Sequence, residues 1–187
     1  MASVVLKGDT SGQVTIAAPA VAGTNTLTLP ALTGTVLTNK TVGTVLQVVS
    51  TTKTDTFSTA STSFVDVTGL SATITPTSTS SQILVFVASN YGTSTSSVVG
   101  IFNLLRGATN IAQPSTAPTF NGTTISYTSV GDVINNWSML FLDSPATTSA
   151  TTYKIQGRAS SGTIYVNRRN TADSAQTSTL TIMEIAA

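Results

Sequence analysis

The chain has 187 residues, a net charge of +1, and only 8% charged residues against 40% hydrophobic ones. Disorder requires low hydrophobicity together with high charge, so this composition predicts a folded protein. Cysteine and histidine are both absent, which excludes a disulfide framework and removes the commonest general base and metal ligand. Without clustered Lys and Arg, nucleic-acid binding is not expected either.

Secondary structure is predicted to be almost entirely β. Thr, Val and Ile, which suit a pleated surface, are abundant, whereas helix-favouring residues are scarce, with one Glu and four Lys. The longest unbroken apolar run, residues 83–88, is far shorter than the roughly 20 residues of a membrane span. The N-terminus lacks a basic region leading into a long apolar core, so we expect neither membrane insertion nor a signal peptide.

Residues 1–42 are predicted to form a series of short β segments: SVVLKG, QVTIAAP, NTLTLP and GTVLT. In the third segment leucine and threonine alternate, which places Leu27 and Leu29 on one face. Pro30 ends this segment. About 40 residues without metal or disulfide are seldom stable alone, so this region is expected to pair with other copies, a partner, or the rest of the chain.

Residues 43–187 contain longer and more apolar segments, at the spacing of a sandwich or barrel. About 140 residues can bury most of their apolar surface, so we expect an independent domain, an antiparallel β-sandwich of jelly-roll type. Within it, residues 82–89 and 98–106 are continuously apolar and expected to be central. The predicted strands are residues 45–51, 63–67, 72–75, 82–89, 98–106, 124–128, 136–142, 152–158, 163–167 and 178–185.

Both ends of the chain resemble structural proteins of tailed bacteriophages, especially fibre proteins. The N-terminal pattern is a strand, Gly-x-x-Ser-Gly, a second strand, an Ala-Gly-x-Asn/Thr-x-Thr-Leu-Pro run, and Gly-Thr-Val-Leu. The C-terminal stretch ends in Thr-x-Met-Glu-Ile-Ala, and the run TFSTASTSFVDVTGLSATITPTSTSSQILVFV resembles the first half of the same module. The N-terminal pattern is carried by Gly8, Ser11, Gly12, Ala22, Gly23, Thr28, Leu29, Pro30, Gly34, Thr35, Val36 and Leu37.

The resemblance implies a homotrimer in the virion, attached by residues 1–42, with residues 43–187 exposed. Tail, baseplate or capsid proteins would then be its partners. The expected function is a small tail fibre without catalysis, assembled in the cytoplasm of the host bacterium. A head fibre or capsid-decorating protein and a glycan-binding or polysaccharide-degrading spike are the alternatives. The residues expected to be buried between chains or against the virion are Leu27, Leu29, Pro30, Val36 and Leu37.

One polar cluster is a candidate contact with a host-surface glycan. Asn167, Arg168 and Arg169 lie together, and arginine makes bidentate bonds to anions such as acidic sugars or phosphate. The alternative, which we favour, is a solvated loop in which Arg168 or Arg169 pairs with Asp173 and contributes little.

Aromatic residues are the second candidate, because their rings stack on sugars. Trp137 and Tyr153 lie in apolar strands, so we expect both in the core. Tyr91 falls in the polar stretch of residues 90–97 and is the aromatic residue that we expect to be exposed.

Catalysis is not expected. Glycoside hydrolysis needs two carboxyl groups about 5–10 Å apart, yet the seven acids are scattered and several fall in predicted turns. The absence of histidine excludes a Ser-His-Asp hydrolase, and no Gly-rich phosphate loop is present. Neither a cofactor nor a metal is predicted.

Overall fold

The computed structural model describes residues 3–7, 10–17, 42–116, 119–127 and 132–187. The chain divides into two units, Met1–Val36 and Leu37–Ala187. The predicted boundary between residues 42 and 43 stays a prediction. All regular elements of the described residues are β-strands, which confirms the all-β prediction.

In the first unit, strands β1 (Ser3–Lys7) and β2 (Gln13–Ala17) form an antiparallel hairpin. Val4 lies opposite Ile16, and Leu6 lies opposite Val14. Because side chains alternate along a strand, these four apolar residues share one face of the hairpin.

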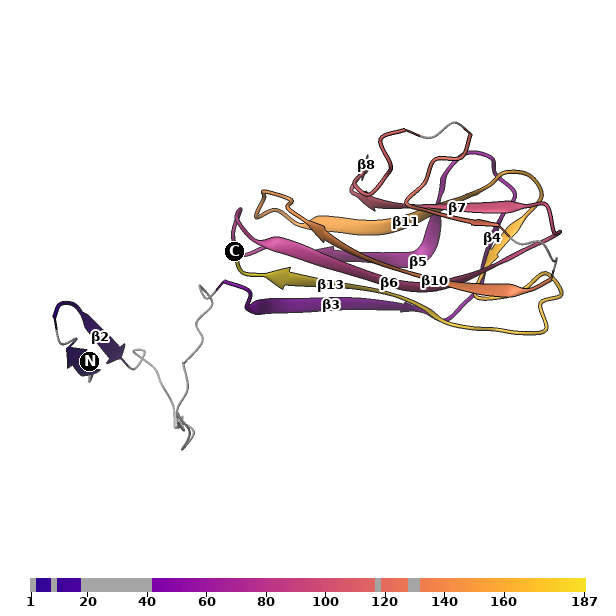
Figure 1. The fold of residues 1–187 in the computed structure, drawn as a ribbon. Coiled ribbons are helices and arrows are strands. Elements are labelled where there is room, and N and C mark those ends of the chain that lie inside the picture. The colour runs from indigo at the N-terminus through magenta and orange to yellow at the C-terminus, as the bar shows by residue number, and fades with distance from the viewer. Residues whose placement is uncertain (1–2, 8–9, 18–41, 117–118, 128–131) are drawn as a thin grey trace. The chain divides into compact units, whose positions relative to one another are not determined.

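In the second unit, two antiparallel sheets form a sandwich (Figure 1). One sheet has the order β3-β13-β6, with β10 on the far side of β6; the other has the order β5-β11-β7, with β9 beside β7. These eight strands are β3 (Val45–Lys53), β5 (Val65–Ile74), β6 (Gln82–Thr93), β7 (Val99–Arg106), β9 (Thr124–Tyr127), β10 (Ile134–Asp143), β11 (Thr151–Ala159) and β13 (Ser178–Ile185).

The eight strands pair in a nested order. The first pairs with the last (β3 with β13), the second with the seventh (β5 with β11), the third with the sixth (β6 with β10), and the fourth with the fifth (β7 with β9). A long hairpin whose pairs alternate between two facing sheets is the connectivity of a jelly roll. The structure therefore confirms the predicted jelly-roll sandwich.

Three short strands complete the sheets. Strand β12 (Ile164–Val166) pairs with the end of β6 and also with β4 (Phe57–Thr59), while β8 (Thr109–Asn110) pairs with the end of β7. As predicted, β6 and β7 are central: each has partners on both sides.

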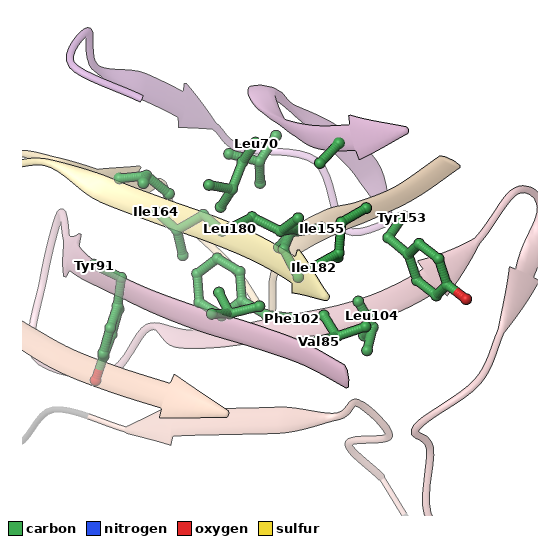
Figure 2. Packing of buried hydrophobic residues seen from close by; sticks show 14 of the residues in the cluster. Leu70, Val85, Tyr91, Phe102, Leu104, Tyr153, Ile155, Ile164, Leu180 and Ile182 are labelled. Carbon is green, nitrogen blue, oxygen red and sulfur yellow. The ribbon is translucent and has the colours of Figure 1, made fainter. Parts of the chain in front are cut away.

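The core lies between the two sheets and is built around Phe102 on β7. Its ring stacks on Trp137 of β10, with centroids 5.3 Å apart, and meets Tyr91 edge-on at 6.0 Å. Figure 2 shows Phe102 between Tyr91 and Tyr153, which lie toward opposite ends of the cluster. Tyr153 is completely buried and Trp137 packs against the core, so the predicted core positions of both residues are confirmed.

Two predicted strands, residues 63–67 and 72–75, fall largely within the single strand β5, which runs from residue 65 to residue 74. Gly69 has a positive φ of 80°, and the pairing of β5 with β11 is interrupted here between Asp66 and Ser71. A glycine within a strand often marks such a bulge. Because glycine is also a common turn residue, the sequence predicted a break between two strands at this point. The short strands β4 and β8 were not predicted, because two or three residues leave no periodic pattern.

Candidate functional site

The five residues predicted to anchor the chain lie outside the described residues. Nothing in the structure therefore tests the assignment of Leu27, Leu29, Pro30, Val36 and Leu37, which stays a prediction.

The expectation that Tyr91 is exposed was wrong: its side chain is completely buried. Strand β6 continues through residues 90–93, where a polar loop was expected, because β12 pairs with this part of the strand. The Tyr91 ring packs on Phe102, and its hydroxyl accepts a hydrogen bond from Ser126. Tyr91 is thus part of the core and does not face a host surface.

Asn167 was also wrongly assigned to host contact, because its side chain is completely buried. Its Nδ2 donates to the main-chain oxygens of Lys53 and Asp55, both at 2.9 Å. Its Oδ1 accepts from Ser178 at 2.6 Å and from Asn90 at 3.2 Å. Asn167, with its positive φ of 64°, therefore joins three segments of one sheet as a structural residue.

The two arginines are bound within their own loop. Arg168 donates to the main-chain oxygens of Arg169 and Asn170, and its guanidinium carbon lies 4.0 Å from the centroid of the Tyr165 ring. Arg169 forms an ion pair with Asp173, which confirms the favoured interpretation of this loop. The hydrogen bond from Arg169 lowers the pKa of Asp173 to about 2. Both guanidinium groups therefore have partners already, which weakens the case for glycan binding here.

The buried carboxylates are also satisfied by protein groups. Glu184 on β13 is completely buried and accepts hydrogen bonds from Gln47, Thr77 and Ser81 at 2.6–2.7 Å. Burial by itself would raise the pKa of Glu184, but the bonds from Ser81, Gln47 and Thr77 outweigh it and lower that pKa to about 2. A carboxylate held ionised by so many donors is poorly suited to proton transfer near neutral pH.

A groove of about 720 Å³ lies over the ends of β6, β10 and β13. Its lining includes Asn90, Asn136, Ser138, Gln176 and Thr179, and none of the described residues that line it is charged. Hydroxyl and amide groups of this kind can donate and accept hydrogen bonds, but they supply no general acid or base at neutral pH.

The hairpin β1–β2 carries an assembly candidate that sequence reasoning did not single out. The four apolar residues on its shared face are all at least half exposed. An isolated two-stranded hairpin is marginally stable at best in water, so this face needs a covering surface. Alternation in Val4-x-Leu6 and Val14-x-Ile16 was the available signal.

Within the residues that the structure describes, no group of three or more Asp, Glu, His or Cys side chains could hold a metal ion. The same residues contain no helix with the length and apolar character needed to cross a membrane.

Comparisons with known proteins identify neither a family nor a close relative. No protein-family model matches the chain, and no curated protein matches it. Among solved structures, the chain resembles those of infectious bursal disease virus, Gt and Gx strains. Each is 15% identical, with TM-scores of 0.44 and 0.43, and covers 98% and 99% of this chain. The match spans only 47% of the virus chain in each case.

Proposed function

We propose that the chain is a non-enzymatic structural protein of a tailed-bacteriophage virion, a small homotrimeric tail fibre. Residues 1–42 attach it to the tail or baseplate, and the jelly-roll domain is exposed for contact with the host surface. The observation that carries the assembly role is the uncovered apolar face of the β1–β2 hairpin, formed by Val4, Leu6, Val14 and Ile16.

The hairpin supports the proposal because its stability depends on a partner. Two strands cannot bury both of their faces, and fully burying one valine or leucine side chain contributes about 1.5–3 kcal/mol. Covering four such residues with other copies or with a virion protein would therefore supply several kcal/mol. The sequence resemblance to phage fibre proteins includes the β1–β2 hairpin. It therefore favours a phage virion as the source of the surface that covers the hairpin.

The fold of the second unit is compatible with this role. Jelly rolls occur in viral capsid and lectin domains, among others. A fold by itself does not determine function, so this agreement is an analogy and adds less than the hairpin does.

Virion incorporation of matched hairpin variants tests the proposal. Leu6→Asp places a charge on the shared apolar face, whereas Val5→Asp places one on the opposite face, next to Thr15. We expect Leu6→Asp to prevent incorporation and Val5→Asp to have a much smaller effect. The jelly-roll domain of both variants should melt at the wild-type temperature. Equal incorporation of the two variants would refute attachment through this face.

Trimer formation and location are tested separately. Sedimentation or light scattering that gives only the 19.1 kDa monomer at assembly concentrations would contradict the homotrimer. Gold labelling of the chain in imaged particles distinguishes a tail fibre from a head fibre or capsid-decorating protein.

A further inference from the structure

A second surface, on the jelly-roll domain, has the properties of an interface. It is the outer face of the sheet β3-β13-β6-β10, which points away from the other sheet. Its apolar part comprises Val48, Leu84, Phe86, Leu140, Leu142 and Met183.

Strand register makes this apolar part continuous. Leu140 lies opposite Phe86, and Leu142 lies opposite Leu84, in the pairing of β10 with β6. On the other side of β6, Met183 lies opposite Leu84 and also opposite Val48 of β3. Leu140 is 65% exposed and Phe86 is 42% exposed, so the band faces solvent in the single chain.

The two outer faces of the sandwich differ in charge. Lys53, Asp143 and Glu184 are the only charged residues on strands β3, β13, β6 and β10, and all three are buried. The outer face of β5 and β11, by contrast, carries the ion pair of Lys154 with Asp66, at 2.8 Å. Among the described residues, an ion pair typical of a solvated surface thus lies on the outer face of β5 and β11 and not on that of β3-β13-β6-β10.

Strand β10 borders this uncharged face and lacks the usual protection of an edge. It pairs with β6 over ten consecutive residues, from Ile134 to Asp143, without a register shift. Its other side has no strand partner among the described residues. Edge strands that stay unpaired commonly carry lysine, proline or a bulge. Strand β10, with the sequence INNWSMLFLD, has none of these.

The size of the surface fits part of a specific interface. Four strands at their usual spacing and five outward positions along each give a footprint of roughly 15 by 25 Å, about 400 Å² in projection. Each partner in a stable interface contributes about 800 Å² of accessible surface. The face, measured in projection, amounts to about half of that value, so it forms a substantial part of one side of such an interface.

We infer that a second copy of this chain covers the outer face of β3-β13-β6-β10. A face without charge does not attract a phosphate backbone or an anionic lipid surface, so an equally uncharged protein surface is its best complement. Another copy presents such a surface, and a contact that reaches past β10 also covers the unprotected edge of that strand. This contact is separate from the hairpin and does not depend on the proposed virion role.

Cross-linking through a single introduced thiol tests the inference directly, because the chain has no cysteine. Ser138→Cys places a thiol on the outer face of β10, and Thr73→Cys places a matched one on the outer face of β5; both positions are exposed. We expect a short bismaleimide to link Ser138→Cys chains several-fold more than Thr73→Cys chains. Equal linking of both, or none above the Thr73→Cys background, would overturn the inference.

A variant with a new charge on the outer face of β10 tests whether this face makes the contact. Adding Leu140→Glu to the Ser138→Cys chain should remove most of the cross-link, because the carboxylate would have to be desolvated in the contact. Adding Thr73→Glu instead should leave it unchanged. Melting curves of all variants check the fold, and unchanged linking in a folded Leu140→Glu chain would overturn the inference.

The hairpin variant Leu6→Asp separates this contact from assembly through residues 1–42. Linking at residue 138 that persists in Leu6→Asp chains supports a contact of the jelly roll itself. Loss of the cross-link in Leu6→Asp chains would show that residues 1–42 bring the copies together. That result would overturn an independent interface on the jelly roll.

Discussion

The hydroxyl of Tyr153 on β11 donates a hydrogen bond to Asp143 Oδ2 on β10, at 2.6 Å, and so joins the two sheets of the sandwich. Arg106 of β7 contacts the same carboxylate at 2.8 Å. Burial, together with the bond to Asp143, raises the pKa of Tyr153, so that it remains a protonated donor over the whole range of neutral pH.

Replacing Tyr153 by phenylalanine should lower the free energy of unfolding by about 1–2 kcal/mol, because a buried carboxylate loses one donor while the ring stays in place. Urea titration at neutral pH measures the loss. The control is Tyr127→Phe, since Tyr127 is 65% exposed, and there we expect no change. Equal stability of Tyr153→Phe and the wild type would show that the bond between the sheets contributes nothing.

Glu184 should give the protein an acid-sensitive stability. Its pKa is about 2 in the folded chain, below the ordinary 4.5. The stabilisation is therefore complete above pH 4.5 and is lost as the pH falls toward 2. This difference corresponds to roughly 3 kcal/mol.

The variant Glu184→Gln isolates this contribution. At pH 7 it should be less stable than the wild type, because an amide cannot accept from all the donors around it. The difference between the two proteins should shrink as the pH falls from 5 to 2. A difference in stability that does not change with pH would contradict a lowered pKa at Glu184. The pKa values of Asp55 and Asp66 are also lowered, but these residues contribute equally to both curves.

Gly157 makes room for the Phe102 ring. A Cβ added at Gly157 would lie 3.1 Å from that ring, and Trp137 and Tyr91 hold the ring in place. We expect Gly157→Ala to cost about 1–3 kcal/mol, as overpacking usually does. In a Phe102→Leu background the added methyl should cost much less, and a double-mutant cycle from thermal unfolding measures the coupling. An equal cost in both backgrounds would place the strain elsewhere.

Asn167 should be among the residues most sensitive to substitution. Asn167→Gly keeps the positive φ but leaves buried partners on three segments without bonds, at a cost of roughly 3 kcal/mol. Asn167→Ala should cost about 1 kcal/mol more, because a Cβ disfavours the left-handed conformation. Chemical denaturation measures both, and a similar stability of the two variants would show that the backbone is not strained.

Sequence reasoning predicted the fold well because apolar periodicity determines strands. The β13 bounds matched the prediction of residues 178–185, and β7 differed by one residue. Nested pairing was not predictable in detail, because it depends on contacts such as that of Val49 with Ile182, far apart in the chain.

The candidate sites were predicted less well, and for a related reason. Asn90 and Asn167 resemble loop residues in sequence, since asparagine favours turns. Their amide groups instead bond to each other and to neighbouring strands inside the fold. Burial of a polar residue depends on partners that lie far away in sequence, so local pattern alone assigned both stretches to the surface.

The pairing of β3 with β13 also determines the two poles of the domain. Gly43 donates to the main-chain oxygen of Ala186, and Ala186 donates to that of Thr44, so the domain begins and ends at one pole. A peptide fused after Ala187 would therefore emerge beside residue 43. The opposite pole is built from internal loops at residues 94–98, 160–163 and 167–177. Apart from the buried residues Val98 and Asn167, the sequence of these loops can vary without disturbing either end of the domain. This pole is therefore the natural place to graft a new recognition loop.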